Sequence, residues 1–430
     1  MNVVVVALGK IGLPLAVQVA RAGHAVIGCD VDPRVVELVN AAREPFPGEA
    51  GLAEALAEVV GDGRLRAQAD TTAAVATGPE LVIAVPPLLV DAHAEPDWRV
   101  LDAVVDDVAR GLGAAARAGA GAGPTVVSVE TTLPVGTTRE RIAPALAAGS
   151  GLEPERDFFA IFSPERVYSG RIFQDLATYP KLVGGLSEAG EARGVSLYRS
   201  FLDAEVRPMG GVEAAELTKL AETTYRDLNI AYANELARYA DRVGIDVERV
   251  IEAANSQPFS HIHRPGVAVG GHCIPVYPHF YLRGNADARL PAVAREINAA
   301  MPAYAVRLLD DALGGLARAR VLILGVAYRG GVKETACSGA FGLRDALAAH
   351  GAIPLAADPL YDDGELTALG FTPWDGAPVD GAILQADHAQ YRELTPADLP
   401  GARAVVDGRD ALDPEPFRGA GVTLARIGRP

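Results

Sequence analysis

The sequence has little cysteine, little lysine and no long hydrophobic run. Its three cysteines, Cys29, Cys273 and Cys337, are too few and too widely spaced for a disulfide framework or a CxxC metal knuckle. Acidic residues outnumber basic ones by 55 to 39, and the net charge of −16 excludes a nucleic-acid-coating surface, which needs a basic face. Only four of the 39 basic residues are lysines, so each lysine is a position to examine.

Apolar runs fall short of the roughly 20 residues that a membrane-spanning helix needs. The apolar residues at the N-terminus have no basic segment before them and end at Gly9, unlike a secretion signal. We therefore expect a cytoplasmic protein with neither a membrane nor a nucleic-acid partner. Hydrophobic residues make up 49% of the 430 residues, which excludes wholesale disorder and suffices for two or three folded domains.

The order of hydrophobic runs predicts an α/β protein. Short runs rich in β-branched residues, typical of strands buried in parallel sheets, occur at residues 2–7, 24–30, 81–85, 125–129, 158–162, 181–184, 320–325 and 353–357. Residues 212–243 have helical periodicity without glycine or proline, which predicts a long helix that bridges domains or forms an oligomer interface. We predict two doubly wound Rossmann-like domains, joined by a helical middle domain with this long bridging helix, with boundaries at residues 1–195, 196–305 and 306–430.

Residues 7–12 form a variant of a dinucleotide-binding fingerprint. The pattern GxGxxG between a strand and a helix, with an acid about 20 residues later, here reads ALGKIG followed by Asp30. Gly9 lets the backbone approach a pyrophosphate, Gly12 allows close helix packing, and the helix N-terminus offers unpaired N–H groups. A carboxylate at Asp30 binds ribose hydroxyls and repels a 2′-phosphate, which favours NAD over NADP. Because Ala7 replaces the first glycine, an ordinary strand–turn–helix is the alternative interpretation.

The segment 270–275, with the sequence GGHCIP, contains a candidate nucleophile. Two glycines before Cys273 let the backbone pass close to a ligand and leave the thiol exposed. A cysteine nucleophile requires a positive charge or a base nearby. A plain loop cysteine is one alternative. A metal site is another, although no carboxylate or second cysteine has ligand spacing, because four histidines are close in sequence: His261, His263, His272 and His279.

Further motifs follow in order along the chain. They are VP at 85–86 with EPD at 95–97, TTLPVGT at 131–137, FSPER at 162–166, KLVGG at 181–185, Lys219 in the long helix, and LGVAYR at 324–329. With residues 7–12 and 270–275, these motifs resemble the UDP-glucose/GDP-mannose dehydrogenase family over essentially the whole chain. The segments 163–171, 225–230 and 269–276 are most similar to the branch that acts on UDP-N-acetylmannosamine or UDP-N-acetylglucosamine.

The resemblance implies a four-electron oxidation of the sugar C6 alcohol to a uronate with two NAD, as in polysaccharide biosynthesis. It implies that Cys273 adds to the aldehyde and that the thiohemiacetal becomes a thioester, which water hydrolyses. Lys219 would hold a proton or stabilise the oxyanion, a task that a permanently charged arginine cannot share. Thr132 and Glu165 would order the water. A solvated helix lysine is the alternative interpretation of Lys219.

The resemblance also implies binding residues. For the cofactor NAD these are Gly9, Lys10, Ile11, Gly12, Asp30, Val85, Pro86, Thr132 and Arg329. For the UDP-sugar, whose nucleotide would bind the C-terminal domain, they are Glu165, Arg166, Lys219, Arg264, Gly270 and Arg409. Arg409 matches a family arginine that can reach the substrate of a neighbouring subunit, although a surface arginine is equally expected there. We predict no metal, and a homodimer or higher homo-oligomer.

Four positions depart from the family pattern. Thr223 stands where the family has asparagine, and Tyr277 stands where it has an aspartate that helps proton transfer. A neutral tyrosine is a poor base at pH 7. Pro87 replaces a threonine near the cofactor, and Ala336 replaces an arginine. These departures leave two alternatives open, an enzyme with an altered substrate or oxidation outcome and a non-catalytic nucleotide-sugar-binding protein. Thr223 and Tyr277 are nevertheless included among the candidate catalytic residues.

Overall fold

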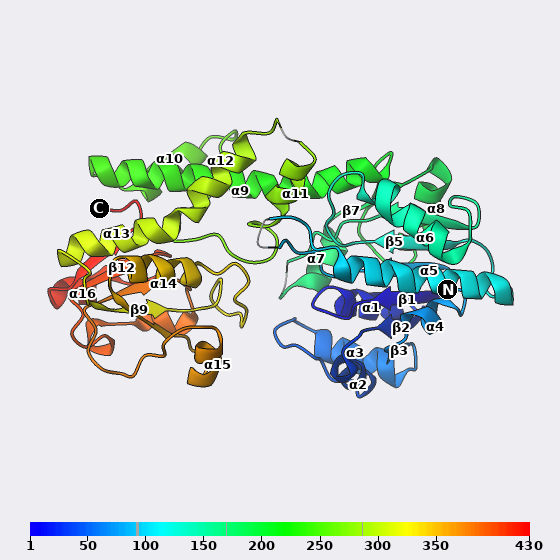
Figure 1. Cartoon of the computed structure of the whole chain (residues 1–430), viewed down its shortest axis with the longest axis horizontal. Coiled ribbons are helices and arrows are strands. Elements are labelled where there is room, and N and C mark those ends of the chain that lie inside the picture. Colours follow the sequence, from blue (N-terminus) through cyan, green and yellow to red (C-terminus); the bar gives the residue numbers. More distant parts are fainter. Residues whose placement is uncertain (92–93, 169, 286) are drawn as a thin grey trace. The chain divides into compact units, whose positions relative to one another are not determined.

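The computed structural model describes residues 1–91, 94–168, 170–285 and 287–430 (Figure 1). Ser169, which falls in the segment 163–171 used for the resemblance, lies outside the described residues. The chain divides into two compact units. Unit 1 contains Met1–Ala221 and His279–Gly284, and unit 2 contains Glu222–Pro278 and Asn285–Pro430. The three domain boundaries stay a prediction.

Unit 1 is built on one twisted sheet. Its strands are β1 (Asn2–Val6), β2 (Ala25–Cys29), β3 (Leu65–Gln68), β4 (Leu81–Ala84), β5 (Thr125–Val129), β6 (Phe158–Phe162), β7 (Lys181–Gly185) and β8 (Val206–Pro208). Their order is β3-β2-β1-β4-β5-β6-β7-β8. The strands from β3 to β6 are parallel, so their carboxyl ends lie along one edge of the sheet. β7 pairs antiparallel with β6.

Helices flank the strands of unit 1, because β1 and β4 are apolar and buried almost throughout. They are α1 (Gly12–Arg21), α2 (Pro33–Asn40), α3 (Leu52–Gly61), α4 (Thr71–Val75), α5 (Arg99–Ala118), the π-helical turn η1 (Thr138–Ile142), α6 (Ala143–Ser150), α7 (Ile172–Thr178) and α8 (Glu188–Tyr198). α5 ends where Gly119 adopts a left-handed conformation with φ 65°.

Unit 2 contains a second parallel sheet. Its strands are β9 (Arg320–Leu324), β10 (Ile353–Ala357), β11 (Gly381–Leu384), β12 (Ala404–Asp407) and β13 (Thr423–Arg426), in the order β10-β9-β11-β12-β13. Its helices are α10 (Val247–Asn255), α12 (Leu290–Ala299), α13 (Met301–Leu313), α14 (Gly339–Ala349), α15 (Asp363–Ala368), η2 (Ala389–Glu393), η3 (Pro396–Asp398) and α16 (Pro414–Gly419). α13 and α14 contribute apolar side chains to the main core of this unit.

Two helices contain residues of both units, namely α9 (Val212–Val243) and α11 (Tyr277–Arg283). The bounds of α9 confirm the long helix predicted at 212–243. The predicted fold class, α/β with two doubly wound sheets and helices between them in sequence, is confirmed. One prediction was wrong, because residues 181–184 were expected to form the last strand of the first half. The chain instead adds β8 beside β7, where three residues with an arginine and a proline had given no strand signal.

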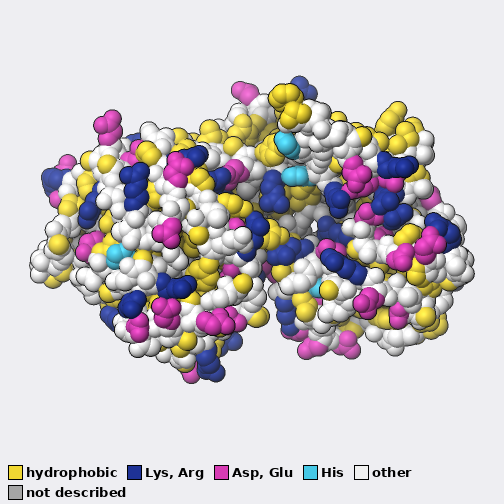
Figure 2. Space-filling model, turned by 180° about the vertical axis from the view of Figure 1, so that it is seen from behind, with side chains coloured by type: hydrophobic (Ala, Val, Ile, Leu, Met, Phe, Trp, Pro, Cys, Tyr) yellow, Lys and Arg dark blue, Asp and Glu magenta, His cyan; other side chains and the backbone are white. Residues whose placement is uncertain are grey.

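No helix among the described residues is long and apolar enough to span a membrane. On the face drawn in Figure 2, acidic and basic side chains are interspersed with uncharged ones. The acidic side chains of this face are therefore spread over it rather than gathered in one patch.

Candidate active site

The loop between β1 and α1 has the backbone of a dinucleotide-binding turn. Ala7 adopts φ 72°, a left-handed conformation that glycine takes more readily, and its N–H donates to Cys29 O at 2.8 Å. A Cβ atom on Gly12 would lie 1.9 Å from Ala7 O, so only glycine fits there. Gly9 is exposed, and a Cβ built on it would meet nothing within 4 Å. The turn thus leaves open space above Gly9.

The groups around this turn fit NAD. Among the described residues, no side chain caps the N-terminus of α1, so its N–H groups can bind a pyrophosphate. Asp30 follows β2, where its carboxylate accepts hydrogen bonds from Leu8 N at 2.8 Å and Asp32 N at 2.9 Å. Asp30 is half-buried, so lone pairs of its oxygens remain accessible to ribose hydroxyls.

The neighbouring strands bring further predicted residues to the same edge. Val85 N donates to Val6 O at 3.0 Å directly after β4. The hydroxyl of Thr131 donates to Pro86 O, which joins the segments that follow β4 and β5. Thr132 is the next residue and is buried. The structure therefore brings the predicted cofactor residues of unit 1 together along one edge of its sheet.

Glu165 and Lys219 are in direct contact in unit 1. Glu165 follows β6, and its main-chain oxygen accepts a hydrogen bond from Lys219 Nζ at 2.6 Å. Its carboxylate Oε1 accepts from Arg166 N at 2.6 Å and Val167 N at 3.2 Å, and its Oε2 accepts from Lys181 Nζ at 2.9 Å. Burial raises the pKa of Glu165, but Lys181 and the N–H of Arg166 outweigh burial and lower it. Glu165 is therefore a fixed carboxylate beside Lys219.

Glu216 attaches the start of α9 to the segment after β5, a role that the sequence did not suggest. Its fully buried carboxylate accepts from Gly136 N at 2.6 Å, Thr138 N at 2.9 Å and Thr138 Oγ at 2.7 Å. Burial raises the pKa of Glu216 to about 7. The only available signal was an acid in the apolar part of a helical pattern. Since Lys219 lies one turn further along α9, these bonds help to fix its position.

In unit 2, Cys273 lies in an exposed loop at the start of a helical turn. Its main-chain oxygen accepts from Tyr277 N at 3.0 Å, and Tyr277 is the first residue of α11. Gly271 N donates to Ala336 O at 2.8 Å. A Cβ atom on Gly270 would lie 2.7 Å from Tyr328 Cβ. The paired glycines thus let this loop pack closely against residues 328–337, and the thiol of Cys273 stays exposed.

A buried polar network supports the same loop from α9. Arg295 donates to Pro275 O at 3.1 Å and to the fully buried carboxylate of Asp227 at 2.8 Å. Asn298 donates to the other oxygen of Asp227 at 2.8 Å. Burial raises the pKa of Asp227 against the opposing charge of Arg295. The sequence did not predict this network.

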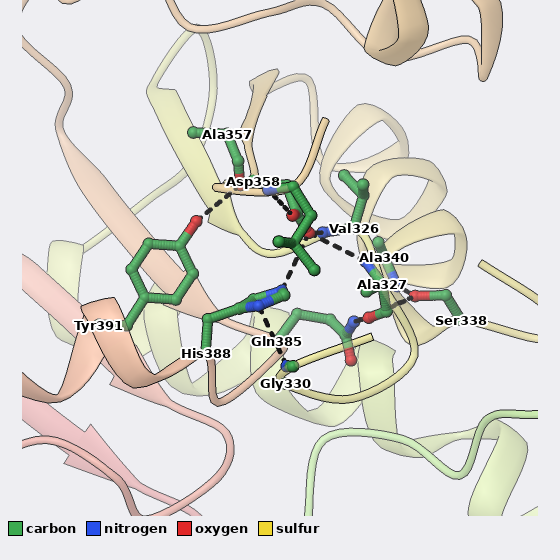
Figure 3. Close-up of polar contacts among 12 residues, drawn as sticks. Val326, Ala327, Gly330, Ser338, Ala340, Ala357, Asp358, Gln385, His388 and Tyr391 are labelled. Atoms are coloured by element: carbon green, nitrogen blue, oxygen red, sulfur yellow. Dashed lines mark hydrogen bonds and ion pairs between the residues drawn. The ribbon is translucent and has the colours of Figure 1, made fainter. Parts of the chain in front are cut away.

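Arg409 is bonded within its own unit. Its Nε donates to Gln385 O at 2.6 Å, and its terminal nitrogens donate to Gln385 Oε1 at 2.9 Å and to Ala268 O and Tyr328 O at 3.3 Å each. Gln385 in turn donates to Ser338 Oγ at 3.0 Å (Figure 3). Arg409 thus joins the loop that precedes Cys273 to the carboxyl edge of the second sheet.

The remaining predicted residues have separate surroundings. Arg264 forms an ion pair with Glu248 at 2.6 Å, and Arg329 lies against the ring of Tyr328. Thr223 is buried on α9. By sequence division, Thr132, Glu165 and Lys219 belong to unit 1, whereas Thr223, Cys273 and Tyr277 belong to unit 2. Among the residues that the structure describes, no three His, Cys, Asp or Glu side chains form a group that could hold a metal ion.

The fold and this edge of unit 1 define the class of NAD-binding Rossmann proteins. The comparisons are more specific. Residues 1–202 match the NAD binding domain of the UDP-glucose/GDP-mannose dehydrogenase family, and residues 213–300 match the central domain of that family. The chain belongs to this family of nucleotide-sugar dehydrogenases. The predicted resemblance and the predicted cofactor NAD are therefore confirmed.

Individual relatives cover nearly the whole chain. A UDP-N-acetyl-D-mannosamine dehydrogenase of Pyrococcus horikoshii is 32% identical over 98% of this chain and 99% of the relative. A solved structure of the UDP-D-ManNAc dehydrogenase from Pyrococcus horikoshii has a TM-score of 0.87 and 30% identity, covering 100% of this chain and 99% of that chain. A UDP-glucose dehydrogenase structure from Pyrobaculum islandicum has a TM-score of 0.86 and 28% identity, covering 99% and 97%.

Proposed function

We propose that the protein is an NAD-dependent UDP-sugar 6-dehydrogenase that oxidises the C6 alcohol of a UDP-N-acetylhexosamine to the uronate. The observation that carries this proposal is the similarity to UDP-N-acetyl-D-mannosamine dehydrogenases over 98% of the chain, with Cys273 exposed in the matching loop. NAD supplies the acceptor for the two hydrides. The overall change converts an alcohol, water and two NAD⁺ into a carboxylate, two NADH and three protons.

Each of these residues has its own task in the proposed reaction. The Cys273 thiolate adds to the C6 aldehyde, and oxidation of the adduct leaves a thioester. Lys219 holds a proton or donates a hydrogen bond to the developing oxyanion. Thr132 and Glu165 order the water that attacks the thioester, which breaks the carbon–sulfur bond and returns the thiolate. Asp30 and the N-terminus of α1 bind the ribose and the pyrophosphate of the cofactor.

A substrate panel with product stoichiometry tests this proposal. Purified protein and NAD are incubated with UDP-N-acetylmannosamine, UDP-N-acetylglucosamine or UDP-glucose, and NADH absorbance and product mass are recorded. We expect two NADH per uronate with one of the acetylated sugars. Cys273→Ala should abolish the uronate, because no thioester can form. The absence of NADH with every sugar would contradict the proposal.

Thr223 and Tyr277 favour a second candidate, an enzyme of altered oxidation outcome. They replace an amide and a carboxylate of the family pattern, and each preorganised group of this kind is worth about 10²–10³ in rate. This candidate predicts one NADH per turnover and an aldehyde product. The double substitution Thr223→Asn with Tyr277→Asp should then raise uronate formation strongly. Binding of NAD and UDP-sugar without turnover would instead indicate a non-catalytic protein.

We also propose that the protein forms a homodimer through α9, and that it acts in the cytoplasm, where both substrates are available. Tyr225, Tyr232 and Tyr239 recur at seven-residue intervals on α9, and each is more than half exposed. Aromatic side chains exposed in a row are typical of an interface. Tyr232→Glu should convert the dimer to a monomer in light scattering coupled to size-exclusion chromatography.

A further inference from the structure

A buried cluster of three charged side chains lies behind Glu165 in unit 1. Lys181, the first residue of β7, donates to Glu130 Oε2 at 2.6 Å and to Glu165 Oε2 at 2.9 Å. The Tyr198 hydroxyl donates to Glu130 Oε1, and Ser128 Oγ lies 2.8 Å from that hydroxyl. Lys181 and Glu130 are at most 4% exposed. The ends of β5, β6, β7 and α8 therefore meet at one ammonium group.

Burying three charged side chains is an unfavourable way to join strands, because the charges lose their hydration. Removing each charge from water has a large desolvation cost, and apolar side chains of similar volume often replace buried ion pairs without loss of stability. The chain also uses arginine for almost all its other cations, yet retains lysine here. A compact ammonium can approach two carboxylates at once, whereas a planar guanidinium favours one carboxylate in a bidentate pair. The arrangement therefore indicates a requirement other than stability.

The pKa values of the two carboxylates that bind Lys181 are shifted in opposite directions. Burial raises the pKa of Glu130 to about 7, against the attraction of Lys181. The pKa of Glu165 is lowered, as described above, because Lys181 and the N–H of Arg166 outweigh burial. Burial lowers the pKa of Lys181, but both carboxylates outweigh this effect and raise it. Burial therefore opposes the ionisation of Glu130, whereas Lys181 and the backbone favour the ionised form of Glu165.

The cluster also determines where the backbone of Glu165 lies. Both of its carboxylate oxygens are bonded, one to Lys181 and the other to the N–H groups of Arg166 and Val167. A side chain fixed at both oxygens restricts its own main chain, and that main-chain oxygen accepts Lys219 Nζ at 2.6 Å. One chain of contacts therefore leads from Tyr198 and Glu130 through Lys181 and Glu165 to Lys219.

We propose that Lys181, held by Glu130 and Tyr198, is a positioning residue that orients the Glu165 carboxylate and, through the Glu165 backbone, the Lys219 amine. This inference deepens the proposed function and rests on it for the roles of Glu165 and Lys219. In that reaction, the cluster aligns the carboxylate that orders the hydrolytic water and the amine that stabilises the oxyanion. Its loss should slow hydrolysis more than binding.

The main variant is Lys181→Met, which retains the length of the side chain and removes the charge. We expect kcat for uronate formation to fall by about 30-fold or more while KM for the UDP-sugar changes less than about threefold. A covalent adduct on Cys273 should accumulate and be detected by mass spectrometry after acid quench. Lys333→Met is the matched control, because Lys333 pairs with Glu365 at 2.5 Å on the surface of unit 2.

Two milder variants separate positioning from folding. Glu130→Gln retains a side chain that accepts from Lys181, and Tyr198→Phe removes only the hydroxyl. We expect kcat losses that decrease in the order Lys181→Met, Glu130→Gln, Tyr198→Phe, with KM unchanged. If Lys181→Met does not fold, the other two variants decide the question. Equal losses in kcat and NAD affinity, or wild-type kcat in all folded variants, would overturn the proposal.

A readout independent of turnover distinguishes this proposal from the proposed function. The acetylation rate of Lys219 by acetic anhydride is measured by peptide mass spectrometry without cofactor or substrate. Lys181→Met should change this rate at least threefold, because the Glu165 main-chain oxygen that accepts from Lys219 is no longer held in place, whereas Lys333→Met should leave it unchanged. A changed rate in a protein that oxidises no UDP-sugar would refute the proposed function and retain the positioning role. An unchanged rate would refute the positioning role.

Discussion

The two sheets begin with the same local arrangement but use it differently. In each, the residue after the first strand has a left-handed backbone, Ala7 with φ 72° and Gly325 with φ 90°. In each, that residue donates its N–H to the end of the second strand at 2.8 Å. In each, the acid that follows the second strand, Asp30 or Asp358, accepts N–H groups of the first loop. The backbone scaffold is therefore repeated.

The difference lies in what occupies the space around the loop. Asp358 is buried and accepts from Val326 N at 2.7 Å, Ala327 N at 3.1 Å and Leu360 N at 2.9 Å, with His388 Nε2 at 3.2 Å (Figure 3). Since Gly331 N donates to the Nδ1 of His388, the proton of the ring is on Nε2 and points to the carboxylate.

The N-termini of α1 and α14 show the same difference, since that of α14 is occupied by a side chain and that of α1 is open. Ser338 caps α14 by accepting from Ala340 N at 3.2 Å, whereas α1 has no side-chain cap among the described residues. Unit 2 thus fills with its own side chains the positions that stay open in unit 1, where we propose that NAD binds. A Rossmann-like scaffold can therefore either bind a cofactor or support a neighbouring loop, here the loop that contains Cys273.

Substitution of Asp358 and Asp30 gives the strongest test of the difference between the two units. Asp358→Ala should lower the free energy of unfolding of unit 2 by about 4 kcal/mol, because several buried donors lose their acceptor. Asp30→Ala should cost about 1 kcal/mol and raise the Kd for NAD at least tenfold. Chemical unfolding and calorimetric NAD binding measure both effects. If Asp358→Ala weakens NAD binding as much as Asp30→Ala does, the two acids do not have different roles.

The pH dependence of Asp358 follows from the same contacts. Burial raises the pKa of Asp358, but His388 and the backbone N–H groups outweigh it and lower the pKa below the ordinary 3.8. A carboxyl with a lowered pKa stabilises the fold above its ordinary value and loses this contribution as the pH falls through the folded pKa. The stability difference between wild type and Asp358→Asn should therefore shrink below pH 3.8.

The glycines of the first loop allow the next test. Gly12→Ala should destabilise unit 1 by about 3 kcal/mol, because its Cβ atom would meet a backbone oxygen that cannot move away. Gly9→Ala is the matched control, since its Cβ atom would meet nothing within 4 Å. It should retain stability within about 1 kcal/mol but weaken NAD binding, because the backbone can no longer approach the pyrophosphate. Unimpaired NAD binding in Gly9→Ala would place the pyrophosphate elsewhere.

The sequence allowed much of this arrangement to be predicted, because the information is local. Residues 7–12, Asp30 and the helix at 212–243 follow from spacing and hydrophobic periodicity, and the confirmed family follows from ordered motifs. Contacts between distant segments could not be predicted in the same way. Glu216 bonds to a turn 80 residues away, and Lys181 joins acids that follow two other strands. Scarcity identified Lys181 as a position to examine, but only the fold shows its partners.

The helix caps give a smaller effect. Ser338→Ala should cost about 1 kcal/mol of stability, the usual value of a serine cap, and leave the stabilisation by NAD unchanged. NAD at 100 times its Kd should stabilise wild type and this variant alike by about 2.7 kcal/mol. Ser187→Ala, which removes the cap of α8 in unit 1, is the matched control. A reduced NAD effect in Ser338→Ala alone would show that α14 also contributes to cofactor binding.

The smallest expected effect concerns Ala7, the residue that departs from the glycine fingerprint. The left-handed backbone of Ala7 costs about 1–2 kcal/mol for an alanine, and glycine removes this cost. Glycine also destabilises the fold by about 0.4–1 kcal/mol, because it gives the unfolded chain more conformational entropy. Ala7→Gly should therefore stabilise unit 1 by up to about 1 kcal/mol. Ala42→Gly, at φ 56° and away from the loop, should do the same. Because Ala7 already has the required conformation, Ala7→Gly should change the Kd for NAD by less than about twofold.

A tenfold tighter Kd in Ala7→Gly that is absent in Ala42→Gly would contradict this expectation. It would mean that the Ala7 methyl group obstructs the cofactor. The open site of unit 1 would then be partly filled, as its counterpart in unit 2 is.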